Sequence, residues 1–276
     1  MSATNGTRRG AVTVTGRPGQ APKPNANGER KWGLHLEGVA VIPGVGDVEW
    51  ERTKKARVLL KEAVTDLGLV VIVGPPGVGK TFSVARAAET CAKSVDQVVW
   101  LEIPTEVRGR ALLANLYPPL AGGPAARGAT EGQLHAGLEA TLSGARRLVV
   151  VDEAQFITSQ ALLTLRSLHA AADTKFALVV VGTHKLLTNL SPELRSRVTG
   201  YADFDRLTDT EAPKVLARFH PRYAEADPAV LAEGNRRYAG GEFRWWTKAL
   251  VLLNRYVDRN QPLTMQVLTD VAKHFL

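Results

Sequence analysis

The sequence predicts an α/β fold, in which an αβα domain built on a parallel sheet is followed by a small C-terminal helical domain. Apolar, β-branched runs alternate with helical segments between residues 69 and 204, an order typical of parallel sheets with helices on both faces. The runs at 69–73, 147–152 and 176–182 have the composition of strands buried on both faces. After Leu207 the pattern contains helices alone, separated by prolines and a glycine pair.

Three parts are expected along the chain. Residues 1–31 are rich in Gly, Pro, Asn, Thr and Ala and hold six basic residues against one acidic residue, which predicts a disordered basic tail. Residues 32–206 are expected to form the αβα domain, with an extended strip over 39–45 before the first helix. Residues 207–276 are expected to form the helical lid.

The remaining elements follow from periodicity, capping residues and helix breakers. A helix over 48–67 should turn Val58, Leu59 and Val64 toward the core, and a helix over 109–116 should end in a breaker-rich loop over 117–129. Thr130 and Gln133 form a capping box that predicts a helix over 130–142. Further helices are expected over 81–90, 159–171, 209–219, 227–238, 242–257 and 264–274, with strands over 97–103 and 200–204.

Composition limits the class of protein. The 276 residues are 45% hydrophobic and 22% charged, which suits one large globular domain with a small satellite. A single cysteine, Cys91, argues against a disulfide framework and indicates a reducing, cytoplasmic setting. No run approaches eighteen apolar residues, so neither secretion nor a membrane span is expected. The net charge of +8 indicates a polyanionic partner, chiefly nucleic acid.

The strongest motif is GPPGVGKT, residues Gly74 to Thr81, which fills the phosphate-loop template at every position and lies between a predicted strand and a predicted helix. Its glycines allow successive N–H groups to face the β- and γ-phosphates, and the helix N-terminus adds partial positive charge. Lys80 would neutralise phosphate oxygens and the Thr81 hydroxyl would bind Mg²⁺. The predicted nucleotide contacts are Gly74, Pro75, Pro76, Gly77, Val78, Gly79, Lys80, Thr81 and Phe82.

Two carboxylates follow the strand at 147–152. Asp152 at the strand end would hold Mg²⁺ through water, and Glu153 would polarise the attacking water. The next strand ends at Thr183, whose hydroxyl could bind that water or the γ-phosphate. His184 is the weaker choice because it opens a helix.

Three arginines are candidates for the same reaction. Arg195 and Arg197 lie within one turn near a helix end, where either could reach a neighbouring subunit's γ-phosphate. The sequence leaves the choice between them open. Arg244 opens the third lid helix and could fold back onto the nucleotide, which would couple the lid to nucleotide state.

Taken together, GPPGVGKT, VVVDEAQ, VVGT, ELRSRV and GGEFR resemble the AAA+ ATPases in order and spacing, over roughly residues 39–274. The resemblance implies hydrolysis of ATP to ADP and phosphate with Mg²⁺, and homo-oligomeric rings or filaments with ATP at subunit junctions. It implies that Asp152 and Glu153 are the second nucleotide motif, Thr183 is sensor 1, Arg197 or Arg195 is the arginine finger, and Arg244 is sensor 2.

Within AAA+, the short chain, the DEAQ and VGT strings and the compact lid are most similar to the transposition regulators, the TnsC-, TniB-, IstB- and Mu B-like helper ATPases. This resemblance implies a cytoplasmic protein encoded by a bacterium, phage or mobile element. It would assemble on duplex DNA without sequence preference, select target DNA, and recruit or stimulate a transposase. The matching DNA-facing positions are Arg108, Arg110, Arg127 and Thr130, where basic side chains and a helix N-terminus could meet phosphates.

Other interpretations stay open. An initiator or loader, or a secretion-associated AAA+ ATPase, would share the nucleotide motifs. A nucleotide-switched scaffold would assemble in the same way with little turnover, and Glu153→Gln would separate it from an ATPase that needs hydrolysis. A small-molecule kinase would not need Arg197 or Arg244, and a helicase is disfavoured because the strand-free C-terminal part leaves no room for a second motor domain.

Overall fold

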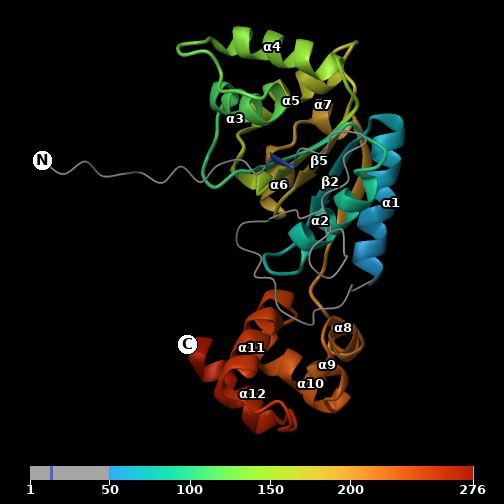
Figure 1. Cartoon of the computed structure of the whole chain (residues 1–276), viewed down its shortest axis with the longest axis vertical. Coiled ribbons are helices and arrows are strands. Elements are labelled where there is room, and N and C mark those ends of the chain that lie inside the picture. The colour runs from blue at the N-terminus through green and yellow to red at the C-terminus, as the bar shows by residue number, and fades with distance from the viewer. Residues whose placement is uncertain (1–12, 15–49, 276) are drawn as a thin grey trace, which may run out of the picture.

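The structure, a computed structural model, describes Thr13–Val14 and residues 50–275, and its centre is a six-stranded sheet (Figure 1). The strand order is β1-β3-β4-β5-β2-β6. All neighbours are parallel except β1, which pairs antiparallel with β3. The strands are β1 (Thr13–Val14), β2 (Leu69–Val73), β3 (Gln97–Glu102), β4 (Arg147–Asp152), β5 (Phe176–Val181) and β6 (Val198–Asp203).

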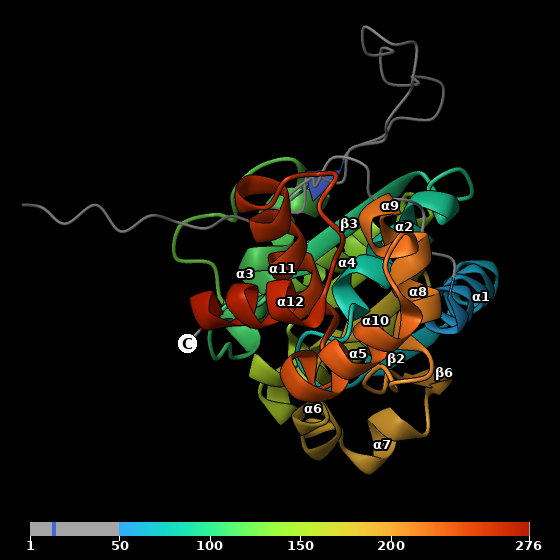
Figure 2. The same ribbon diagram turned by 90° about the horizontal axis from the view of Figure 1, so that it is seen from below.

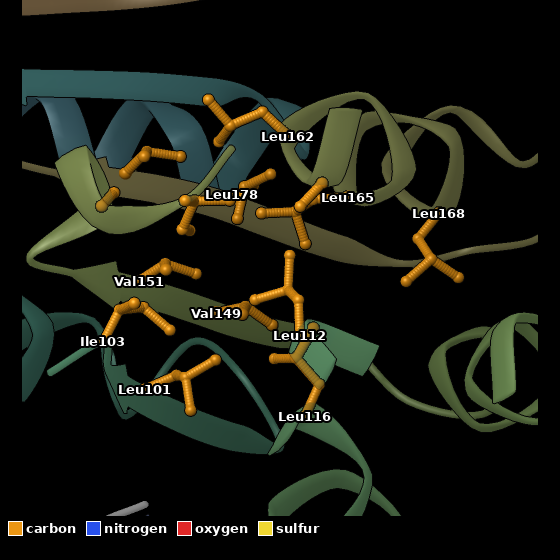
Figure 3. Close-up of a cluster of buried hydrophobic side chains, with 14 of the residues drawn as sticks. Leu101, Ile103, Leu112, Leu116, Val149, Val151, Leu162, Leu165, Leu168 and Leu178 are labelled. Carbon is orange, nitrogen blue, oxygen red and sulfur yellow. The ribbon is translucent and has the colours of Figure 1, made fainter. Parts of the chain in front are cut away.

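Helices cover both faces of the sheet and give it two apolar cores. On one face, α1 (Glu51–Asp66) and α2 (Lys80–Cys91) pack on Val70, Ile72 and their neighbours. Figure 3 shows the other core, where leucines of two helices meet Val149 and Val151 of β4. That face carries α3 (Gly109–Ala121), α4 (Glu131–Ser143), α5 (Ser159–Ala170), α6 (Lys185–Asn189) and α7 (Pro192–Arg195). The predicted α/β fold is confirmed.

The C-terminal helices form a separate bundle beyond the carboxyl ends of the strands (Figures 1 and 2). Its core is aromatic: Trp246 and Tyr223 are fully buried, and the Tyr223 hydroxyl donates to the Trp246 carbonyl at 2.7 Å. In the part of the chain that the structure describes, no helix has the length and apolar character needed to cross a membrane. The bundle holds α8 (Ala212–Phe219), α9 (Pro221–Ala224), α10 (Pro228–Gly234), a π-helical turn (Asn235–Ala239), α11 (Phe243–Tyr256) and α12 (Met265–Ala272).

Helix α3 is longer than predicted. The loop expected over 117–129 begins only after Ala121, so the prolines at 118 and 119 lie inside the helix. Burial of Pro119 and Leu120 against the core outweighs the backbone hydrogen bonds that two prolines remove. The last turn is also capped, because Gln97 Nε2 donates to the Pro119 carbonyl at 2.8 Å.

Two further expectations differ from the structure. Val58 was expected in the core but is 54% exposed, because α1 buries Ala56 and Leu60 instead, whereas Val64 is buried as predicted. Thr13–Val14 lie in the segment predicted to be disordered, yet they pair with Val98 and Val99 of β3. The rest of that segment, Trp32 and the strip at 39–45 lie outside the described residues.

Candidate nucleotide-binding site

The loop between β2 and α2 has a backbone that favours glycine, as two of its positions illustrate. Gly74 has a φ of +152°, and a Cβ there would lie 2.3 Å from the Phe204 carbonyl oxygen. Gly77 has a φ of +77° and packs against Arg244 and Glu242 of the lid. These contacts hold the loop as a cradle at the N-terminus of α2, the arrangement that binds phosphate.

Lys80 lies inside this cradle. Its ammonium donates to the carbonyl oxygens of Gly74 and Pro75, both at 2.8 Å. Burial lowers the pKa of Lys80, while the carboxylates of Glu153 and Asp152 act in the opposite direction. The lysine therefore bonds its own loop in this structure, and phosphate oxygens could replace the two carbonyls as acceptors.

Asp152 and Thr81 meet at the end of β4. The Thr81 hydroxyl donates to Asp152 Oδ2 at 2.8 Å, and the Glu153 N–H donates to Oδ1 at 2.8 Å. Burial raises the pKa of Asp152 to about 6. A buried carboxylate beside a hydroxyl is a hard-oxygen donor set that suits Mg²⁺, whose charge would stabilise the ionised form. The residues present thus fit the expected metal.

Glu153 adopts an unusual backbone conformation, with a φ of +55° at the turn into the 3₁₀ helix Ala154–Phe156. Its carboxylate accepts a hydrogen bond from Gln155 Nε2, and Gln155 Oε1 accepts the Thr183 N–H at 3.0 Å. The structure therefore brings Glu153 and Thr183 together through Gln155. His184 instead binds Asp203 at 2.8 Å.

Gln155 was missed at the sequence level. The only available signal was a polar residue in the turn after the acidic pair, in the string DEAQ. Nothing in the sequence indicates that this side chain is 8% exposed or that it lies against Gly182 of the next strand. Trp50 and Arg52 were also missed: the Trp50 ring lies 3.7 Å from the position a Cβ on Gly79 would take, and Arg52 stacks over that ring.

The candidate arginines have different surroundings. Arg195 donates through Nε to the Leu190 carbonyl at 3.1 Å and through Nη2 to the Leu187 carbonyl, so it caps the end of α6. Arg197 is exposed and its side chain has no hydrogen bond or ion pair among residues 50–275. The main-chain N–H of Arg244 donates to the Gly77 carbonyl at 2.9 Å. The lid helix α11 therefore begins directly on the phosphate loop.

The predicted DNA-facing residues surround two neighbouring helix starts. Arg108 is the N-cap of α3, is exposed, and lies 3.9 Å from Glu106. Arg110 Nε donates to the Ala129 carbonyl at 2.9 Å, which ties α3 to the start of α4. The Thr130 hydroxyl is occupied in the capping box, so its contact with a phosphate would come from the helix N-terminus. Arg127 is exposed in the connecting segment.

The segment that forms this site matches a known protein family. The AAA domain family matches residues 64–190, which include the phosphate loop, Asp152, Glu153 and Thr183. This segment is an AAA domain. The predicted resemblance of the chain to the transposition-regulator group of AAA+ ATPases is also confirmed, by the relatives that follow.

Two curated relatives are the ATP-dependent target DNA activators B of Escherichia phage Mu and Escherichia phage D108. Each is 28% identical over an alignment of 178 residues, which covers 61% of this chain and 54% of the relative. The match thus spans about half the length of those proteins. It gives no information on the rest of either protein.

Solved structures with the same fold include archaeal and bacterial proteins. The Aeropyrum pernix ORC2 protein, determined as ADPNP-ADP complexes, has a TM-score of 0.60 at 18% identity and covers 83% of this chain and 69% of its own. CDC6P from Pyrobaculum aerophilum has a TM-score of 0.62 at 18% identity, covering 75% and 62%. The Thermotoga maritima RuvB branch migration motor has a TM-score of 0.53 at 17% identity, covering 82% and 70%. At these identities the likeness establishes the fold alone.

Proposed function

We propose that this chain is an ATP-dependent, DNA-binding AAA+ ATPase that assembles on duplex DNA and regulates transposition in the cytoplasm. It selects target DNA and recruits or stimulates a transposase. The observation that carries the proposal is a phosphate loop joined to the Asp152 carboxylate by a hydrogen bond, in a chain similar to two proteins named ATP-dependent target DNA activators. In this proposal residues 32–206 are the ATPase domain and residues 207–276 are the lid.

The ATPase step assigns a role to each residue of the site. Lys80 and the N–H groups of the loop would bind the β- and γ-phosphates, and Thr81 and Asp152 would hold Mg²⁺, whose positive charge would stabilise negative charge on the phosphate oxygens. Glu153 takes a proton from the attacking water, and Thr183 at the end of β5 orients that water or the γ-phosphate. The hydrogen bonds at Asp152 and Gln155 support this arrangement because they bring the two strand ends together.

A neighbouring subunit completes the site. Arg195 is engaged with the carbonyls of α6, whereas the guanidinium of Arg197 has no partner within residues 50–275. We therefore assign Arg197 as the arginine finger that stabilises negative charge on the next subunit's γ-phosphate in the transition state. Arg244, at the start of α11, reports nucleotide state to the lid because its N–H already binds the phosphate loop.

DNA contact is assigned to the adjoining starts of α3 and α4. Two helix N-termini and the guanidinium groups of Arg108 and Arg127 face phosphates there, with Arg110 holding the two segments together. Phosphate contacts of this kind carry no sequence information. Binding should therefore be independent of sequence, and it should weaken as salt rises because counterions are released.

Co-sedimentation with random-sequence duplex DNA tests this proposal directly. We expect binding that requires Mg²⁺ and ATP and falls steeply between low and physiological salt. Replacing Arg108 and Arg127 together by alanine should reduce the salt slope by about 2 in log–log terms. The exposed Arg259 on the lid provides the matched control. Binding that is indifferent to nucleotide and salt would exclude the assignment.

A further inference from the structure

Gln155 has a buried side-chain amide that has no assigned role of its own in the proposed reaction. It lies in the 3₁₀ turn after Glu153 and is 8% exposed. Its two polar atoms point to different strands: Nε2 donates to Glu153 Oε2 after β4, and Oε1 accepts the Thr183 N–H after β5. One side chain therefore connects the predicted base with the predicted sensor.

The chemistry of the two partners determines which way the amide faces. The Thr183 N–H can only donate, so the atom facing it must be the amide oxygen. The amide NH₂ is then turned toward Glu153, whose carboxylate can only accept when ionised. A carboxylate in place of this amide would put two acceptors face to face, and a methyl thioether would leave both partners without a bond.

The surrounding backbone is shaped for this side chain. Gly182 has no side chain, and a Cβ there would lie 2.7 Å from Gln155 Oε1. Its φ is outside the left-handed region, so glycine is required at this position for space and not for backbone conformation. Asn189 of α6 donates to the Ile157 carbonyl at 3.0 Å, which holds the end of the 3₁₀ turn against α6. The amide is therefore confined between β5 and α6.

We propose that Gln155 is a positioning residue for hydrolysis, which fixes the Glu153 carboxylate and couples its place to the end of β5. This inference rests on the proposed ATPase function. Glu153 has a backbone conformation that non-glycine residues disfavour. The hydrogen bond from Gln155 holds the Glu153 carboxylate in place and leaves the other lone pairs of that carboxylate for water. A change at Thr183 on nucleotide binding then moves the base with it.

Gln155→Met tests the inference, because methionine has a similar length and makes neither hydrogen bond. We expect kcat for ATP to fall about tenfold to a hundredfold, with KM changed by less than about twofold. Gln155→Glu should lose at least as much, since it opposes Glu153 with a second carboxylate. Gln160→Met, at an exposed position of α5, should leave both constants unchanged.

Gly182→Ala provides an independent route to the same change. The added methyl group should displace the Gln155 amide and reproduce the kcat loss of Gln155→Met, whereas Gly144→Ala, where a Cβ meets nothing closer than 3.7 Å, should not. In a Glu153→Gln background, Gln155→Met should lower kcat less than about twofold further, because both substitutions affect the same group. Full additivity would overturn the inference.

One readout does not require turnover. In the nucleotide-free protein, Gln155→Met should speed hydrogen exchange of the Thr183 amide about tenfold relative to wild type, measured by NMR, while the Val179 amide is unchanged. A wild-type chain without ATPase activity would refute the proposed hydrolysis but leave this comparison intact. Unaltered Thr183 exchange, or a kcat unaffected by Gln155→Met in a folded protein, would overturn the role of Gln155.

Discussion

Arginine side chains are used differently at the two edges of the sheet. At the amino edge, Arg146 Nη2 donates to the carbonyls of Val64 and Thr65, both at 2.5 Å, and Arg147 Nη1 donates to the Thr141 carbonyl at 2.8 Å. At the carboxyl edge, the side chain of Arg244 beside the phosphate loop has no hydrogen bond or ion pair within residues 50–275. Arg146 and Arg147 at the amino edge thus bind the protein's own backbone, whereas the Arg244 guanidinium at the carboxyl edge makes no hydrogen bond to residues 50–275.

The contrast separates structural charges from those available to a ligand. A guanidinium that satisfies several carbonyls of helix ends contributes to the stability of the fold. The carboxyl edge instead holds features that cost stability, namely a buried carboxylate at Asp152 and a left-handed residue at Glu153. Parallel sheets bind ligands at the carboxyl ends of their strands, so these costs lie where nucleotide binding can offset them.

Arg197→Ala should have the largest effect. If Arg197 acts on a neighbour's γ-phosphate, turnover should fall about 10³-fold while ATP binding and thermal stability stay unchanged. Arg195→Ala is the matched variant: it removes the cap on α6 and should lower the free energy of unfolding by about 1–2 kcal/mol. Phosphate release, nucleotide titration and thermal melts measure the three quantities. An inactive, fully stable Arg195→Ala with an active Arg197→Ala would reverse the assignment.

Glu153→Gln should have the second-largest effect: ATP turnover should fall about 10²-fold, while ATP-dependent DNA binding is retained. Glu139→Gln on α4 is the control. Mixing Glu153→Gln subunits with Arg197→Ala subunits sharpens the test, because about a quarter of the junctions then combine an intact base with an intact arginine. Turnover should recover toward that fraction of wild type. No recovery in mixed assemblies would place both residues in one subunit's site.

The nucleotide motifs were predictable because their chemistry fixes residue type and spacing. GPPGVGKT and the strand that ends in Asp152 provide the proposed phosphate and metal ends of the site, and the structure joins them through the Thr81–Asp152 hydrogen bond. The strands were predictable because runs such as Leu69–Val73 are buried on both faces and apolar throughout.

The errors have a common physical cause, which is tertiary packing that local sequence does not show. Pro118 and Pro119 indicate a loop by propensity, but core contacts of α3 keep them helical. Val58 was predicted to be buried because it is a large apolar residue, but the face of α1 that packs on the sheet carries the small residue Ala56 instead. The position of Gln155 depends on a hydrogen bond to the distant Thr183 backbone. The choice between Arg195 and Arg197 depends on whether a side chain bonds the carbonyls of Leu187 and Leu190, which no spacing rule encodes.

At the amino edge, Arg147→Met should lower the free energy of unfolding without changing ATP turnover. It removes bonds to the carbonyls of Thr141 and Ala145 and to the Gln97 side chain. The free energy of unfolding should fall by about 2 kcal/mol, measured by urea denaturation, because these acceptors lose their donors. ATP turnover of Arg147→Met, measured well below its melting temperature, should match wild type. The control Lys93→Met should match wild type in both turnover and free energy of unfolding. A loss of turnover in the folded variant would contradict the division between the edges.

His169 should produce the smallest effect, and only at acid pH. Burial lowers the pKa of His169, whose Nε2 lies 2.9 Å from the Leu67 carbonyl and whose ring meets Phe176 edge-on. Below the ordinary histidine value near 6.5 the unfolded chain binds a proton that the folded chain resists, so the free energy of unfolding falls as pH drops.

Comparing urea midpoints at pH 7.5 and 5.5 isolates this contribution. The decrease from neutral to acid pH should be larger in wild type than in His169→Gln, which keeps a donor for the Leu67 carbonyl and does not titrate. ATP turnover measured at pH 7.5 should be the same in both proteins, because the neutral imidazole lies at the edge remote from the nucleotide. An equal decrease of the urea midpoint in both proteins would show that His169 is as solvated in the folded protein as in the unfolded chain. A change in ATP turnover in His169→Gln would show that the amino edge of the sheet affects the nucleotide site at the carboxyl edge.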